Sequence, residues 1–126
     1  MNNNKSTGNL GEDIACGFLK KRGFKILERN HKEHFDEIDI IARSFDGILV
    51  FVEVKTMDVF LGSAILPEDH MTREKFRKIK RGCLMFIAKH PQIIDDKKGW
   101  RIDLIAISLS DDGGPYKINH YENILL

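Results

Sequence analysis

Two carboxylates and an ammonium group occur in this chain in a combination that can hold a metal ion and activate a water molecule. Asp39 lies in residues 37–43, and Glu53 and Lys55 lie in residues 48–55. Both segments alternate charged with β-branched residues, which predicts two strands. The four residues between them end in a glycine, which can take the left-handed conformation that closes a short loop. We therefore expect a hairpin.

A hairpin of this length also determines which residues face each other. When Ser44 faces Ile48, the apolar pairs fall on one side of the ribbon, namely Ile40 with Val52 and Ile38 with Val54. The charged pairs fall on the other side, namely Asp39 with Glu53 and Glu37 with Lys55. We expect a core to cover the first side and a charged site to form on the second.

Two carboxylates that face each other destabilise a strand pair unless a cation lies between them. Mg2+ binds carboxylate and carbonyl oxygens and keeps water or phosphate as further ligands. We therefore expect Asp39, Glu53 and the main-chain carbonyl of Val54 to hold Mg2+, with Mn2+ as the alternative ion. Lys55 would orient or help deprotonate a metal-bound water, or neutralise charge on a phosphate. A surface salt-bridge ladder is the competing interpretation, although the apolar residues 50–52 indicate a buried strand.

Composition restricts the class of protein. The chain has 126 residues, enough for one domain with a single core, and a formal net charge of +1. Cys16 and Cys83 have no metal-ligand spacing, so we expect buried thiols in a reducing compartment rather than a disulfide. The sequence contains no apolar signal region and no apolar run of membrane-spanning length. We expect a soluble cytoplasmic protein with no membrane partner.

Periodicity and turn residues predict an order of elements. Residues 1–7 are polar, and we expect a disordered tail there, followed by a single domain at residues 8–126. Helices are predicted near residues 8–22 and 72–89, and strands at residues 24–29, 37–43, 48–55, 100–108 and 116–121. Residues 30–35 are expected to be a loop whose two histidines lie at the surface and bind no metal. Residues 56–69 predict a long loop that could close over a substrate.

The second predicted helix carries a basic surface that the small net charge conceals. Six cations in residues 73–81 face a single acid, and these are Arg73, Lys75, Arg77, Lys78, Lys80 and Arg81. Such a run could be an ordinary solvated helix face. Six mutually repulsive charges are more readily explained by attraction to nucleic-acid phosphates, which predicts binding that weakens steeply with salt.

Two further acids could join the site or have local roles. Glu12 lies away from the centre of the apolar stripe of the first helix and could reach the strands. Its alternative role is that of a solvated first-turn carboxylate that stabilises the helix dipole. Asp103 lies in an apolar strand with Arg101 two residues before it on the same face, so we expect a structural ion pair rather than a third metal ligand.

The order helix, three strands, helix, strand, together with Asp39, thirteen residues and then Glu53-Val54-Lys55, resembles the restriction-endonuclease-like (PD-(D/E)xK) nuclease superfamily. More closely, the chain resembles the YraN-like family of small bacterial proteins. The resemblance spans about residues 8–108 and includes Gly8-x-x-Gly11-Glu12 with Ala15, Gly23-Phe24 with Ile26-Leu27 and Asn30, Glu37 to Ala42, Phe51 to Thr56, Gly62-x-Ala64, Lys75-x-x-Lys78-Ile79 and Arg101-x-Asp103. It implies an α/β fold of αβββαβ order with a mixed central sheet flanked by helices.

The resemblance also implies a function and roles for residues. The expected activity is divalent-metal-dependent hydrolysis of nucleic-acid phosphodiester bonds, first of all in DNA during repair, recombination or processing. Asp39 and Glu53 would hold the metal, and Lys55 would serve the attacking water. Glu12 matches a helix glutamate that the similar Holliday-junction resolvases add to their site, and Lys75 matches a basic position that faces the substrate.

One position departs from the family pattern. Asp36 stands where the family usually has glycine, and its extra carboxylate could crowd the phosphate or change the metal preference. The alternative function is a catalytically inactive module of the same fold that binds nucleic acid or a partner protein. A homodimer and a DNA-processing protein partner stay open at this point.

Overall fold

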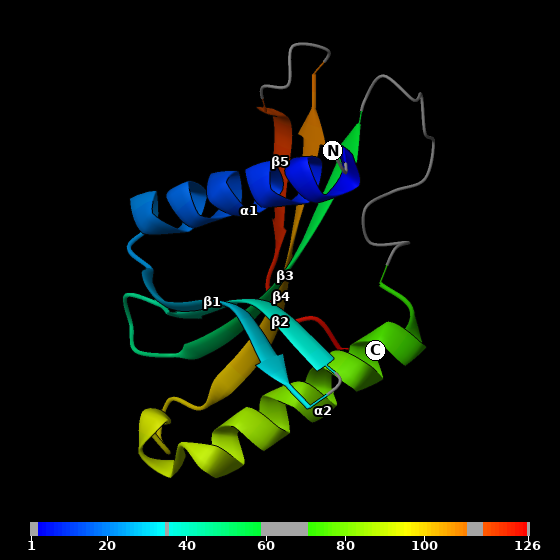
Figure 1. The fold of residues 1–126 in the computed structure, drawn as a ribbon. Coiled ribbons are helices and arrows are strands. Elements are labelled where there is room, and N and C mark those ends of the chain that lie inside the picture. Colours follow the sequence, from blue (N-terminus) through cyan, green and yellow to red (C-terminus); the bar gives the residue numbers. More distant parts are fainter. Residues whose placement is uncertain (1–2, 35, 59–70, 111–114, 126) are drawn as a thin grey trace.

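The computed structural model describes residues 3–34, 36–58, 71–110 and 115–125. Within these residues the elements are α1 (Asn3–Lys21), β1 (Lys25–Glu33), β2 (Asp36–Arg43), β3 (Leu49–Asp58), α2 (Arg73–Lys89), the short 3-10 helix η3 (Pro91–Ile93), β4 (Trp100–Leu109) and β5 (Pro115–Tyr121) (Figure 1). The expected αβββαβ order is confirmed, and the predicted edge strand follows as β5.

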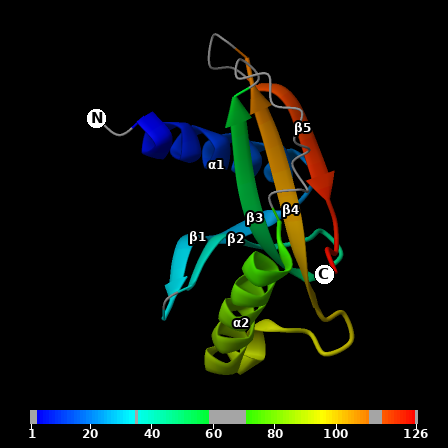
Figure 2. The ribbon, with the colours of Figure 1, turned by 90° about the vertical axis from the view of Figure 1, so that its right-hand side faces the viewer.

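The five strands form one mixed sheet in the order β1-β2-β3-β4-β5. Only β3 and β4 pair in parallel, and the chain passes between them through α2. The other neighbours pair antiparallel. Figure 2 shows β3, β4 and β5 side by side. The α/β fold with a mixed central sheet flanked by helices, which the resemblance implies, is thus confirmed.

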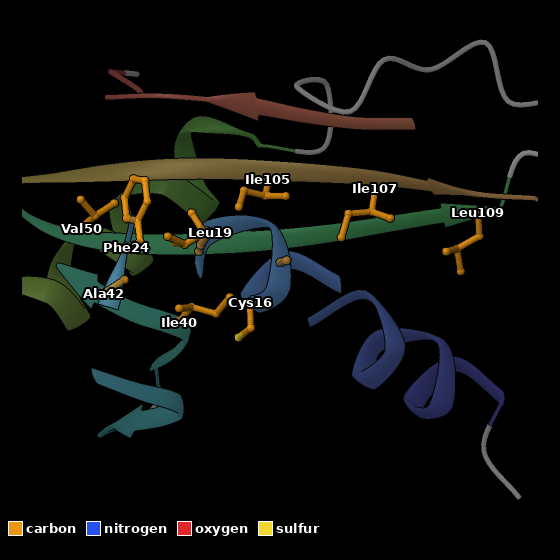
Figure 3. Packing of buried hydrophobic residues seen from close by; sticks show 11 residues of the cluster. Cys16, Leu19, Phe24, Ile40, Ala42, Val50, Ile105, Ile107 and Leu109 are labelled. Atoms are coloured by element: carbon orange, nitrogen blue, oxygen red, sulfur yellow. The ribbon is translucent and has the colours of Figure 1, made fainter. Parts of the chain in front are cut away.

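Each face of the sheet is covered by one helix. α1 packs on one face, where its buried side chains meet residues of β2, β3 and β4 (Figure 3), and this cluster comprises Ala15, Cys16, Leu19, Phe24, Ile40, Ala42, Val50, Val52, Ile105, Ile107 and Leu109. α2 packs on the other face, where the cluster comprises Ile38, Ile41, Leu49, Phe51, Met71, Phe76, Cys83, Phe86, Ile102 and Leu104. Neighbouring strand residues therefore alternate between the two cores, as a sheet buried on both faces requires.

The β2–β3 hairpin has the predicted register. Ile40 pairs with Val52, and the Ser44 N–H donates to the Ile48 carbonyl at 2.9 Å. Gly47 has a φ of +92°, which is the left-handed conformation that its position predicts.

The tip of the β1–β2 hairpin turns away from β3 and rests on α2 (Figures 1 and 2). A Cβ atom added to Gly82 of α2 would lie 3.1 Å from the Cβ atom of Asp36, so the two elements touch there. The prediction that Ile38 and Val54 share one side of the ribbon is therefore wrong. Ile38 packs in the α2 cluster and Val54 against the α1 cluster, because β2 twists toward α2 beyond Ile40.

Several predicted boundaries also need correction. α1 begins at Asn3, inside the predicted tail at residues 1–7, because a polar first turn carries no apolar periodicity. β1 continues to Glu33 through the predicted loop at residues 30–35, where the ring of His31 packs 4.9 Å from that of Phe86. β3 extends to Asp58, and residues 59–69 of the predicted long loop lie outside the described residues.

Candidate metal and phosphate site

Asp39 of β2 and Glu53 of β3 lie close together, one residue beyond Ile40 and Val52, the last paired residues of the hairpin. The charge of Asp39 acts on the Glu53 carboxyl group, and the Val54 N–H donates to Asp39 Oδ2 at 2.8 Å. Burial raises the pKa of Asp39 to about 6, and the charges of Glu12 and Glu37 add to this shift. Burial and the Asp39 charge raise the pKa of Glu53 to about 8, against the opposing charges of lysines 55 and 75. Ionisation of one carboxyl group therefore disfavours ionisation of the other.

The Val54 contact marks the point where the two strands part. Hydrogen-bonded pairs recur at every second residue of an antiparallel ladder, so a ladder counted from Ser44 and Ile48 would let the Val54 N–H donate to the Ile38 carbonyl. The Asp39 carboxylate accepts that N–H instead. Since the N–H and C=O of one strand residue point to the same side, the Val54 carbonyl also points into this gap. A predicted main-chain ligand thus adjoins both carboxylates.

A cavity of about 260 Å3 opens beside Glu53 between the β1–β2 hairpin and α2. Its lining comprises Asp36, Glu37, Glu53, Lys55, Met71, Lys75, Lys78, Ile79 and Leu104. Lys55 lines it with Glu53, as expected for residues two apart on a strand. Of the six cations predicted to bind nucleic acid, only Lys75 and Lys78 line this cavity.

The other cations of α2 have different surroundings. Arg77 and Lys80 border a shallow groove on the outer side of the helix together with Leu84. Arg81 forms a two-pronged ion pair with Asp36, with donor–acceptor distances of 2.9 and 2.8 Å. This guanidinium lowers the pKa of the Asp36 carboxyl, so the extra acid beside the site is ionised and paired. Arg73 is exposed at the start of the helix.

Glu12 approaches the carboxylate pair from α1. Its side chain is 14% exposed, and its Oε1 atom is buried 3.8 Å from the Arg29 guanidinium without a hydrogen-bond partner in the described part of the chain. Burial raises the pKa of Glu12, and the Glu37 charge acts in the same direction. Gly11 makes this approach feasible, since a Cβ atom there would overlap the Oγ1 atom of Thr56, which follows Lys55 in β3. Glu12 is thus not the solvated acid of the alternative interpretation.

The remaining predictions concern residues away from the cavity. Arg101 and Asp103 form the expected ion pair at 3.0 Å, and both cysteines are buried and free. No group of three or more His, Cys, Asp or Glu side chains with metal-binding geometry occurs among the described residues. No helix in the described part of the chain is long and apolar enough to cross a membrane.

The apolar part of the cavity was not foreseen from the sequence. Met71, Ile79 and Leu104 form it, from α2, the residues before it, and β4. A signal was present for the helix, because lysines 75 and 78, Ile79 and Gly82 follow the i, i+3, i+4, i+7 spacing of one helix face. That spacing separates the cavity-facing cations from the outer ones.

Two solved structures resemble this fold at low sequence identity. One is a crystal structure of a repair endonuclease from Pyrococcus abyssi, with a TM-score of 0.46, 16% identity and coverage of 90% of this chain and 41% of that chain. The other is an EndoMS complex with double-stranded DNA, with a TM-score of 0.43, 17% identity and coverage of 78% and 36%, respectively. The chain thus spans less than half the length of either protein.

Sequence comparison identifies nearer relatives. The model of the family described as "Uncharacterised protein family UPF0102" matches residues 11–107. A UPF0102 protein of Dictyoglomus turgidum is 45% identical over 112 residues, which cover 88% of this chain and 89% of the relative. A UPF0102 protein of Trichlorobacter lovleyi is 37% identical over 120 residues, which cover 95% and 90%. The chain therefore belongs to the UPF0102 family, the YraN family that its motifs resemble.

Proposed function

We propose that this protein is a divalent-metal-dependent nuclease that hydrolyses phosphodiester bonds of nucleic acid, with DNA as the first substrate to test. The observation that carries this proposal is the juxtaposition of Asp39 and Glu53 beside a cavity that Glu53 lines together with three lysines. Two half-buried acids that face each other rather than a cationic side chain, and whose pKa values are raised, are an arrangement typical of functional sites.

The donor set fits a hard divalent cation. Asp39, Glu53 and the Val54 carbonyl offer only oxygen atoms, which suit Mg2+ or Mn2+ better than Zn2+. A cation between the two acids would offset the burial and the neighbouring negative charges that raise their pKa values to about 6 and about 8. Glu12, with its unpartnered Oε1 atom, would add a third carboxylate close to Asp39.

The lysines have separate roles in this proposal. A bound divalent ion would supply a Lewis acid that polarises the scissile phosphate and lowers the pKa of a coordinated water. Lys55 lies beside Glu53 and would hold the attacking water in line with the phosphorus atom or stabilise charge on a non-bridging oxygen. Lys75 and Lys78 would bind phosphates on either side of the scissile bond. In hydrolysis the attacking water loses a proton and forms a new P–O bond, the P–O bond to the leaving oxygen breaks, and the leaving oxygen takes up a proton.

Calorimetric titration with Mn2+ and Mg2+ tests the metal site. The wild-type protein should bind, and Asp39→Ala and Glu53→Ala should bind about tenfold more weakly or not at all, since each removes a ligand. Asp36→Asn is the matched control in the same cavity, because Arg81 already neutralises that carboxylate. Unchanged metal affinity in Asp39→Ala and Glu53→Ala would reject the assigned ligands.

A cleavage assay tests the chemistry. Linear, branched, flapped and single-stranded DNA should be cut by the wild-type protein with Mn2+, and Lys55→Ala should cut on the order of a hundredfold more slowly. Equal rates in both would exclude Lys55 from the mechanism. Nucleic-acid binding without any cleavage would instead support a catalytically inactive module, for which the cations of α2 are the supporting observation.

A further inference from the structure

We propose that the cavity beside Glu53 receives an unpaired nucleoside, so that the protein acts on nucleic acid where a base is not paired. This inference rests on the proposed nuclease function and names the substrate class for that site. It follows from the shape of the cavity and from its lining, which includes apolar side chains that phosphate binding does not need.

The first observation is the apolar wall of the cavity. Leu104 is 2% exposed and Met71 is 7% exposed, and both line the cavity with Ile79. Leu104 pairs with Glu53 across β3 and β4, so this wall begins directly beside the carboxylates. Phosphates and hydrated metal ions gain nothing from such a surface, whereas a nucleobase presents apolar faces that pack against aliphatic side chains.

The second observation is that the cavity is closed at one end. The tip of the β1–β2 hairpin touches α2 at Gly82, and the ion pair between Asp36 and Arg81 joins them at the same place. A continuous strand cannot pass through this contact. The group that enters must therefore branch from the backbone, as a nucleoside does when it leaves the base stack.

The third observation is the size of the cavity and its charge. Its volume of about 260 Å3 lies just below the roughly 300–1,000 Å3 of small-molecule sites, which suits one nucleoside and excludes a base pair. Lys75 and Lys78 also line it, from the side of α2. A nucleoside joined to a phosphate at Glu53 would extend along Leu104 with its neighbouring phosphates near these lysines.

Fluorescence of 2-aminopurine tests the proposal without requiring cleavage. Two DNA duplexes carry the probe, one as an unpaired single-nucleotide bulge and one paired with thymine, and both are titrated with protein in EDTA. Among the described residues, the cavity lining contains no aromatic ring that would quench the probe, so the bulge signal should rise several-fold with wild-type protein. The paired probe should show a much smaller change.

Ile79→Trp fills the cavity, and Leu84→Trp is the matched control on the outer side of the same helix, where Leu84 is 49% exposed. Because an added tryptophan can itself quench the probe, the variants are compared by the ratio of the dissociation constants of the paired and the bulged duplex. The preference for the bulged duplex should vanish in Ile79→Trp and persist in Leu84→Trp, with Mn2+ affinity unchanged in both. Met71→Phe replaces Ile79→Trp if circular dichroism shows that the latter does not fold. No rise with wild-type protein, or the same preference for the bulged duplex with the filled cavity, overturns the proposal.

The outcome separates this inference from the proposed function. Mn2+ binding and DNA cleavage without a rise of the bulge signal would leave the nuclease function intact and reject the nucleoside cavity. A preference for the bulged duplex that the filled cavity abolishes, in a protein that neither binds Mn2+ nor cuts DNA, would support the cavity and reject the nuclease.

Discussion

Asp103 and Asp39 are both acids on central strands of the sheet, yet their surroundings have opposite effects. Asp103 is 0% exposed and accepts hydrogen bonds from Arg101 at 3.0 Å, from the His120 ring at 2.8 Å and from the Asn123 N–H at 2.9 Å. These donors overcome the effect of burial and lower the pKa of Asp103. Groups of the same chain therefore satisfy the hydrogen bonds of the Asp103 carboxylate.

Asp39 has no comparable set of donors within the described residues. Its carboxyl group receives one N–H, from Val54, and otherwise faces the carboxyl group of Glu53. Burial therefore prevails, and the pKa of Asp39 rises to about 6. Burial disfavours the charged form of both acids, so it does not by itself account for their opposite pKa shifts. The partners do, and an acid left uncompensated by the chain is available to a cation from outside.

Removing the structural acid should have the largest effect on stability. Asp103→Ala leaves Arg101 without its buried counter-charge and the His120 ring without its hydrogen-bond partner, and it should lower the free energy of unfolding by about 3–5 kcal/mol. Urea denaturation at pH 7 measures this. Glu53→Gln is the matched change in the pair of Asp39 and Glu53 and should leave the free energy of unfolding unchanged or raise it. The contrast fails if both variants lose similar stability.

For each of the two acids, the sequence allowed one neighbouring side chain to be predicted. The pair of Asp39 and Glu53 follows from a short loop, because loop length sets hairpin register locally. The ion pair of Arg101 with Asp103 follows from two residues on one strand face. His120 could not be assigned to Asp103, since the pairing of β4 with β5 depends on the whole sheet and not on local spacing.

The opening beside Asp39 depends on contacts that are distant in sequence. The strands part there because the hairpin tip packs on α2, through Asp36 with Arg81 and through Glu33 with Lys89. Each of these contacts joins residues more than forty positions apart. The alternating charged and apolar residues of β2 predict a ladder that continues past Ile40. The ladder ends there because the hairpin tip packs on α2. The cavity wall was missed for the same reason.

Two glycines of α1 differ in how closely they approach the sheet near Glu12. A Cβ atom at Gly11 would meet Thr56, whose own Cβ atom would lie 3.0 Å away, whereas a Cβ atom at Gly17 would have nothing within 4 Å. Thr56 is β-branched, so rotation replaces one clashing group by another. Gly11→Ala should therefore cost about 1–3 kcal/mol through overpacking, and Gly17→Ala should gain up to about 1 kcal/mol of helix propensity.

Thermal unfolding of the two glycine variants measures the difference. Gly11→Ala should also weaken Mn2+ binding, because α1 must move away from β3 and carry Glu12 with it, whereas Gly17→Ala should bind as the wild type does. Equal metal affinity in both variants, combined with the expected stability difference, would show that Glu12 contributes nothing to the metal site.

The smallest expected effect is a difference in how Asp39 and Glu53, on one side, and Asp103, on the other, make stability depend on pH. Asp39 and Glu53 have native pKa values of about 6 and about 8, above their ordinary values of 3.8 and 4.5. Their stabilising contribution is therefore complete below those ordinary values and is lost as pH rises through the native ones. Asp103, with its lowered pKa, contributes in the opposite sense, and its contribution is lost only as pH falls below about 4.

Between pH 6 and 8 the free energy of unfolding of the wild-type protein should fall by on the order of 1 kcal/mol per pH unit as the shared proton leaves. Glu53→Gln should lack most of this slope, and Mn2+ should abolish it in the wild type by replacing the proton. His31 also has a raised pKa, but it is present in both proteins and cancels in the difference. Parallel slopes in wild type and Glu53→Gln would mean that the two carboxyl groups do not share a proton. The proposed difference between Asp103, whose charge is balanced within the chain, and Asp39, whose charge would be balanced by a bound cation, would then have no physical basis.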